Sequence, residues 1–227
     1  MRLEVLPDAD TAASRAAARI ADAAREAIAA RGRFVFAVSG GHSPWVMLSE
    51  LAGEPLPWEK IHVFQVDERV APAGDPDRNL THLKESLLSR APLPEANIHA
   101  MPVEAADLDA AARDYARVLE KNAGSPPALD LVHLGLGPDG HTASLVPGDP
   151  VLSVADRDVA PTGVYMGHRR MTLTYPVLDR ARSVLWLVTG AEKAPVLPRL
   201  MRGDATIPAG RVSAARADVV ADRAAAP

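Results

Sequence analysis

The sequence predicts an α/β fold with a mostly parallel, Rossmann-like sheet that is covered by helices on both faces. Two observations support this prediction. Short apolar segments such as Phe34–Val38 and Val184–Val188 recur along the chain, and each has the length of a buried strand. Segments with apolar residues at three- and four-residue steps lie between them and predict helices. Strands that alternate with helices form parallel sheets that are buried on both faces.

The first elements form a helix, a strand and a second helix. Thr11–Arg31 is rich in alanine, carries apolar residues at helical spacing and ends at Gly32, which predicts an amphipathic helix with a glycine stop. Phe34–Val38 is the first predicted strand. The loop Ser39–Pro44 follows it and leads into a second helix that extends through Leu51.

The same alternation continues along the rest of the chain. Further strands are predicted at Ile61–Val66, Leu129–Leu134, Met171–Thr174 and Val184–Val188. Helices are predicted around the leucines from Leu80 to Leu88, over Asp107–Lys121, and from about Ala191 to Met201 with an interruption near Pro195 and Pro198. The terminal segment Arg223–Pro227 is expected to be disordered. Because no long linker or repeat is visible, residues 1–227 are expected to form one domain.

Composition excludes several classes of function. The 227 residues are 48% hydrophobic, which is enough for a sizeable core. A formal net charge of -4 without a basic run argues against nucleic acid as a partner. The absence of cysteine excludes disulfides, thiolate catalysis and cysteine-ligated zinc. No secretory leader or membrane span is visible, so we expect a soluble, cytoplasmic protein, either a monomer or a small homo-oligomer.

The loop after the first predicted strand has the features of an anion site. Gly40 and Gly41 let the backbone approach an anion closely, and we expect Ser43 to cap the next helix with Pro44 at its first position. Free backbone N–H groups at a helix N-terminus attract phosphate. The alternative is that the two glycines only make a tight turn. The loop is not a P-loop, because the Gly-Lys-Ser/Thr ending is missing.

Polar residues also follow the second predicted strand. Asp67, Glu68 and Arg69 come directly after Val66, so they should emerge at the same edge of the sheet as the first loop. An acidic side chain there can accept hydrogen bonds from sugar hydroxyls or orient a base, and arginine can bind an anion. A solvated ion pair on the surface is the alternative interpretation.

The strongest local signal is the loop Gly135–Leu145, which follows a third predicted strand. Its glycines and its proline fix an irregular backbone that presents Asp139 and His141. Histidine is the side chain best suited to move protons near neutral pH, so we predict His141 as a catalytic residue. The remaining histidines lack such a setting, and none has metal-ligand spacing: His42, His62, His82, His99, His133 and His168. We therefore expect neither a metal ion nor a cofactor.

Three cations lie near the predicted strands of the C-terminal half. Arg169 and Arg170 precede the strand that begins at Met171, and Lys193 follows the loop after Val184–Val188. Each position can deliver a positive charge to a phosphate, although a lone cation is more often a surface charge.

Together these segments resemble the glucosamine-6-phosphate isomerase/6-phosphogluconolactonase family, within the wider superfamily of glucosamine-6-phosphate deaminases and ribose-5-phosphate isomerases. The matching segments are SGGHSP, VFQVDERV with Arg78 and Asn79 after it, GLGPDGHTASLVPG, RMTLTYPVL and VTGAEKA. They extend from Ser39 to about Ala194. The resemblance implies a deaminase-like fold and the hydrolysis of 6-phosphogluconolactone, a step of the oxidative pentose phosphate pathway, with a small-molecule sugar phosphate as the partner.

The resemblance also implies the roles of individual residues. Those that would bind the substrate phosphate are Gly40, Gly41, Ser43, Arg170 and Lys193, and those that would hold the sugar are Asp67, Arg69 and Asn79. His141 would be the general base, with Asp67 the first candidate if another group takes that role. Arg170 is favoured over Arg169 because it adjoins the Met171 strand.

Two alternatives belong to other classes of function. A deaminase of this superfamily carries a glutamate soon after the histidine, where this chain has Val146, and a hydrophobic side chain cannot transfer a proton. A sugar-phosphate-sensing transcription regulator would carry an N-terminal helix-turn-helix, but only about thirty residues precede the first predicted strand. The lactonase interpretation is therefore preferred.

Overall fold

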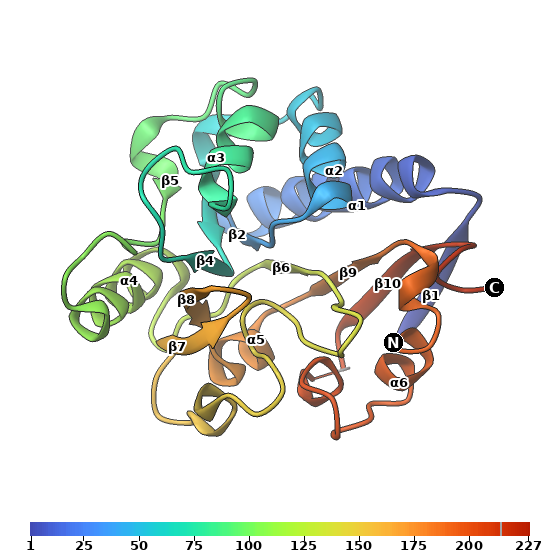
Figure 1. Cartoon of the computed structure of the whole chain (residues 1–227). Coiled ribbons are helices and arrows are strands. Elements are labelled where there is room, and N and C mark those ends of the chain that lie inside the picture. The colour runs from blue at the N-terminus through green and yellow to red at the C-terminus, as the bar shows by residue number, and fades with distance from the viewer. Residues whose placement is uncertain (214) are drawn as a thin grey trace.

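A seven-stranded parallel sheet forms the centre of the molecule (Figure 1). The computed structural model describes residues 1–213 and 215–227. The strands lie in the order β1-β10-β9-β6-β2-β3-β5, and each neighbouring pair is parallel. Their bounds are Arg2–Leu6 (β1), Phe34–Val38 (β2), Ile61–Gln65 (β3), Ile98–His99 (β5), Leu131–Leu134 (β6), Val184–Val188 (β9) and Ala217–Asp222 (β10). The predicted parallel sheet is confirmed.

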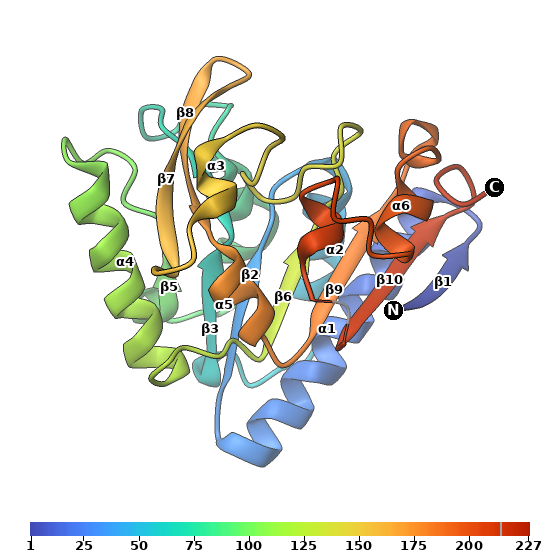
Figure 2. The same ribbon diagram turned by 90° about the horizontal axis from the view of Figure 1, so that it is seen from below.

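Helices cover both faces of this sheet, as predicted (Figures 1 and 2). One face carries α1 (Ala9–Arg31), α2 (His42–Ala52), α3 (Asn79–Leu83) and the π-helical turn η2 (Lys84–Leu88). The other face carries α4 (Leu108–Ala123), α5 (Tyr175–Arg180) and α6 (Leu197–Met201). Strand β2 shows why both faces are apolar: Phe34 and Phe36 pack toward α1 and α2, whereas Val35 and Ala37 belong to the core under α4.

A second, antiparallel sheet stands beside the carboxyl end of β3. Its order is β4 (Asp67–Arg69), β8 (His168–Leu173) and β7 (Val159–Tyr165). Strand β8 begins at His168 instead of the predicted Met171, so Arg169 and Arg170 lie within the strand and not before it. Val159 and Met171 join the same buried cluster as α4 and α5, and for this reason we propose that both sheets form one domain.

Short 3₁₀ turns complete the chain at η1 (Trp58–Lys60), η3 (Glu95–Asn97), η4 (Pro150–Ser153), η5 (Ala191–Lys193) and η6 (Ala209–Arg211). The predicted interruption near Pro195 is confirmed, because η5 and α6 are separate elements. The predicted glycine stop of the first helix is also confirmed: Gly32 has φ 77°, and its N–H donates to the carbonyl of Ile28. No helix within the described residues is long and apolar enough to cross a membrane.

The outer strands β1 and β10 were not predicted. Strand β1 is mostly exposed or half-buried, and it alternates charged with apolar residues too briefly to stand out. The expected disorder of Arg223–Pro227 is wrong, because the N–H of Arg223 donates to Leu6 and Ala225 is buried. Pairing with β1 thus orders the C-terminal segment that follows β10.

A buried histidine in β6 makes the stability of the fold depend on pH. Burial lowers the pKa of His133 from 6.5 to about 3, so this side chain is neutral in the folded protein. The unfolded chain takes up a proton below about pH 6.5, and therefore the free energy of unfolding should decrease as the pH falls from there toward 3. The slope should be up to about 1.4 kcal/mol per pH unit for this group.

Urea denaturation at pH 7, 6, 5 and 4 measures this slope. The His133→Asn variant is the control, because its amide oxygen can accept from the N–H of Ser39 as the His133 Nδ1 does, at 3.4 Å. Its slope should be shallower than that of the wild type, and equal slopes would contradict the assignment.

Candidate functional site

Loops from four parallel strands border one cavity of about 470 Å³ at the carboxyl edge of the main sheet. Most of its lining comes from the segments after β2, β3, β6 and β9, and β8 of the second sheet adds Arg170. The nine residues to which the family resemblance assigns a role all line this cavity: Gly40, Gly41, Ser43, Asp67, Arg69, Asn79, His141, Arg170 and Lys193. Residues that are up to about 150 positions apart in the chain therefore meet in a single site.

The loop between β2 and α2 forms one end of the cavity. Gly41 is the N-cap of α2 and has φ 126°, a conformation that residues with a side chain rarely adopt. A Cβ on Gly40 would lie 2.0 Å from the side-chain oxygen of Asn79, so the backbone is packed closely against that amide. Free N–H groups of the first turn of α2 thus lie at the cavity and can bind an anion.

The expected cap at Ser43 is wrong. Helix α2 begins at His42, so Ser43 lies inside the first turn and Pro44 is not the first helical residue. The hydroxyl of Ser43 is 2.6 Å from that of Thr189, in the loop after β9. This contact joins two loops of the cavity, and nothing in the local sequence around Thr189 indicated it.

The loop after β6 presents His141 with its ring oriented by Asp139. Nδ1 of His141 lies 2.6 Å from Oδ1 of Asp139, which also accepts the backbone N–H of His141 at 3.1 Å. When Nδ1 donates to this carboxylate, Nε2 keeps a free lone pair, which is the form that a general base needs. Burial opposes ionisation of Asp139, but the charge and hydrogen bonds of His141 outweigh it and keep the carboxyl pKa below its ordinary value.

Glu68 organises the loop that carries Asp67, Arg69 and Asn79. It is fully buried, and its carboxylate accepts the backbone N–H groups of Arg69, Asn79 and Leu80, each at 2.8 Å. Its oxygens are thus already occupied by the protein, and Glu68 does not line the cavity. Of the two adjacent carboxylates, Asp67 is the one that faces the cavity.

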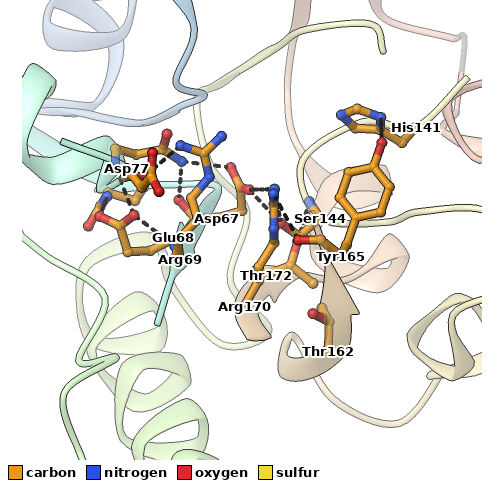
Figure 3. A network of polar contacts seen from close by, with 12 residues as sticks. Asp67, Glu68, Arg69, Asp77, His141, Ser144, Thr162, Tyr165, Arg170 and Thr172 are labelled. Atoms are coloured by element: carbon orange, nitrogen blue, oxygen red, sulfur yellow. Dashed lines mark hydrogen bonds and ion pairs between the residues drawn. The ribbon is translucent and has the colours of Figure 1, made fainter. Parts of the chain in front are cut away.

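Asp67 is held rigidly by its neighbours. Its Oδ2 accepts from the hydroxyl of Ser144 at 2.5 Å, and the amide of Asn79 donates to its backbone carbonyl at 3.0 Å. In Figure 3, Arg170 and Tyr165 lie between Asp67 and His141. This arrangement suits Asp67 to hold a substrate hydroxyl on one side of the cavity while His141 acts on the other.

Arg170 is a buried cation that its protein neighbours neutralise only in part. Its side chain is 5% exposed, and the nearest carboxylate oxygen, on Asp67, is 4.0 Å away. Burial lowers the pKa of the Arg170 guanidinium, and the charge of Asp67 opposes that effect. A buried charge without a close partner is costly, and an anionic ligand would stabilise it. The neighbouring Arg169 is exposed and lies outside the lining of the cavity, so of these two arginines Arg170 is the one at the cavity.

Lys193 brings a second cation to the cavity from the loop after β9. Its Nζ lies 3.4 Å from a carboxylate oxygen of Glu192, which is largely exposed. A weak, solvated pair of this kind leaves the ammonium available to a stronger anion. Across residues 1–213 and 215–227, no group of three or more His, Cys, Asp or Glu side chains is arranged to hold a metal ion.

Sequence comparisons identify relatives over most of the chain. Residues 7–221 match the model of a family described as glucosamine-6-phosphate isomerases/6-phosphogluconolactonase. A 6-phosphogluconolactonase of a Synechocystis species is 45% identical over 184 residues, which cover 79% of this chain and 76% of that protein. A 6-phosphogluconolactonase of Mycobacterium tuberculosis is 35% identical over 218 residues, which cover 88% of this chain and 86% of the relative.

Solved structures share the same architecture. A 6-phosphogluconolactonase from Thermotoga maritima superposes with a TM-score of 0.86 and 27% identity, covering 97% of this chain and 98% of that one. A monomeric glucosamine-6-phosphate deaminase also reaches a TM-score of 0.86, at 19% identity over 100% of this chain and 99% of that chain, and thus has the same fold. The expected deaminase-like fold is confirmed.

The position of His141 depends on the absence of a side chain at Gly137. A Cβ there would lie 2.1 Å from Nδ1 of His141, so the Gly137→Ala variant should displace the ring and break its contact with Asp139. A crystal structure of the variant measures the distance between Nδ1 and Oδ1. The matched control is Gly135→Ala, because a Cβ on Gly135 meets no atom within 4 Å. A ring that keeps its contact with Asp139 in Gly137→Ala would contradict this steric account.

Proposed function

We propose that this chain, which belongs to the family of glucosamine-6-phosphate isomerases and 6-phosphogluconolactonases, hydrolyses 6-phospho-D-glucono-1,5-lactone to 6-phospho-D-gluconate. The observation that carries the proposal is the common cavity, which has an oriented histidine on one loop and, on others, backbone N–H groups and cations that can bind an anion. A lactone is a cyclic carboxylic ester, so an enzyme that hydrolyses it is a carboxylic ester hydrolase. Its reaction belongs to carbohydrate metabolism, in the oxidative pentose phosphate pathway.

Substrate binding begins with the phosphate. The backbone N–H groups around Gly40 and Gly41, together with Arg170 and Lys193, would hold the dianion at one end of the cavity. Ser43 supports this end through its contact with Thr189. Asp67, Arg69 and Asn79 would bind the ring hydroxyls and turn the lactone carbonyl toward His141. Fixing the reacting atoms in this way removes much of the entropic barrier.

His141 then acts as the general base. Its Nε2 removes a proton from water while the water oxygen attacks C1, and Asp139 stabilises the imidazolium that forms. The oxyanion at C1 receives hydrogen bonds from loop N–H groups or from Arg69. His141 returns the proton to the ring oxygen as the C1–O bond breaks. The reaction needs no covalent intermediate, and we propose that it needs no metal ion or cofactor.

The deaminase alternative lacks its second proton-transfer group. Val146 occupies the position of the deaminase glutamate, is 5% exposed and does not line the cavity, so this position supplies no carboxylate to His141. A purely sensing function would need the anion site but not the Asp139–His141 pair. We further propose that the enzyme works in the cytoplasm as a monomer or small homo-oligomer, without nucleic acid. The absence of cysteine agrees with a reducing compartment.

Removal of the base is the most direct test of this mechanism. His141→Asn keeps a polar side chain but lacks a basic nitrogen, so kcat should fall by about 10²- to 10⁴-fold. The assay starts from freshly made lactone and follows 6-phosphogluconate formation through its coupled oxidation. The rate of spontaneous lactone hydrolysis is subtracted. The control is His62→Asn in β3, outside the cavity lining. A folded His141→Asn protein with wild-type turnover would contradict the base assignment.

Phosphate recognition is tested by neutralising Lys193. In Lys193→Met, kcat/KM for the phosphorylated lactone should fall by about 10- to 10³-fold, which is roughly 1.4 to 4 kcal/mol. Unphosphorylated gluconolactone should be affected much less, because it makes no charge contact with this side chain. Arg169→Gln removes an exposed cation outside the cavity lining and should leave kcat/KM unchanged for both lactones. Equal losses on both lactones in Lys193→Met would refute the phosphate role.

A further inference from the structure

The hairpin of β7 and β8 brings Tyr165 against the Asp139–His141 pair. Tyr165 ends β7 and pairs with His168 at the start of β8. The two residues between them, Met166 and Gly167, have φ 50° and 85°, which is the left-handed conformation of tight two-residue hairpin turns. The turn therefore fixes the end of the hairpin from which Tyr165 extends.

The phenol hydroxyl of Tyr165 contacts both members of the Asp139–His141 pair. It donates to Oδ2 of Asp139 at 3.0 Å and lies 3.4 Å from Nδ1 of His141. The imidazole and phenol rings are arranged edge to face, with their centroids 5.4 Å apart. Because Oδ1 of Asp139 accepts from His141, both oxygens of this carboxylate are held. Burial and the hydrogen bond to Asp139 raise the pKa of Tyr165, so the hydroxyl keeps its proton as a donor.

Tyr165 also contacts Arg170, the proposed phosphate ligand. The guanidinium carbon of Arg170 lies 5.0 Å from the centroid of the phenol ring, and Nη2 of Arg170 donates to the backbone carbonyl of Tyr165 at 3.4 Å. Figure 3 shows the ring between Arg170 and His141. Tyr165 itself does not line the cavity, so it acts on the site through these two neighbours.

We propose that Tyr165 is a positioning residue that holds the Asp139 carboxylate toward His141 and links the Asp139–His141 pair to Arg170. The inference rests on the proposed function, because it assigns His141 as base and Arg170 as phosphate ligand. The hydroxyl prevents the carboxylate from rotating away from Nδ1, and this keeps Nε2 directed into the cavity. The ring supports the guanidinium by a cation–π contact.

The two contacts can be removed separately. Tyr165→Phe loses only the hydroxyl, so kcat should fall about tenfold while KM for the phosphorylated lactone stays the same. Tyr165→Leu also loses the aromatic face beneath Arg170, so KM should rise in addition. A merely structural residue would lower the urea midpoint without separating kcat from KM in this way.

The pH response gives a second measurement that does not need turnover. The titratable groups in contact with His141 are Asp139 on its own loop and Tyr165 on the hairpin, and Arg170 adds a positive charge behind the phenol. Without the donated hydrogen bond, the Asp139 carboxylate can rotate away from Nδ1 and stabilises an imidazolium less. In Tyr165→Phe, the midpoint of the His141 titration by NMR should therefore move to lower pH, and the acid limb of kcat/KM should follow it.

A matched control exists in α5. Tyr175 also donates its hydroxyl to a carbonyl, that of Pro208 at 3.0 Å, and also carries an arginine over its ring, Arg211 at 4.5 Å. It is outside the cavity lining, so Tyr175→Phe should keep the wild-type kcat, KM and His141 midpoint.

Several results would overturn the inference. A folded Tyr165→Phe enzyme with wild-type kcat and an unchanged His141 midpoint would refute the link to Asp139, and equal KM values for Tyr165→Leu and Tyr165→Phe would refute the link to Arg170. Wild-type protein without a rate above spontaneous hydrolysis would contradict the proposed function instead, and the NMR midpoints would still decide the role of Tyr165.

Discussion

The common direction of the central strands is the constraint on which the site depends. Strands β2, β3, β6 and β9 are parallel, so their carboxyl ends lie along one edge of the sheet, and the chain returns to the other edge between them. The segments that follow these strands supply most of the cavity lining. The Gly40–Gly41 loop, a carboxylate, a histidine and a lysine are thus brought together without being near one another in sequence.

Buried polar groups make this edge rigid, and rigidity is what a site of this kind requires. Glu68 ties the start of α3 to β4 through three backbone N–H groups, and Ser144 fixes Asp67. Arg170 is the exception, since its charge is buried without a close partner. A dianionic substrate would offset the cost of burying this charge. Binding of such a ligand should therefore also stabilise the folded protein.

The sequence predicts the inner part of the molecule well because the inner strands are continuous apolar segments. Phe34–Val38 and Val184–Val188 have the predicted bounds, and the motif loops place His141 and Lys193 at the cavity. The β7–β8 hairpin could not be predicted in the same way, since β7 contains proline and glycine and its partner begins with His168 and two arginines. Contacts such as Tyr165 with Asp139, or Ser43 with Thr189, depend on tertiary packing that no local pattern reports.

On the proposed function, one bound molecule contacts the Gly40–Gly41 loop, Arg170 and Lys193 with its phosphate and His141 with its reacting carbon. A crystal structure with 6-phosphogluconate, the proposed product, measures this directly. We expect the phosphate to contact the Gly40–Gly41 backbone, Arg170 and Lys193, and the C1 carboxylate to lie within hydrogen-bonding distance of Nε2 of His141. A phosphate bound outside this loop, or a C1 carboxylate directed away from His141, would contradict the account.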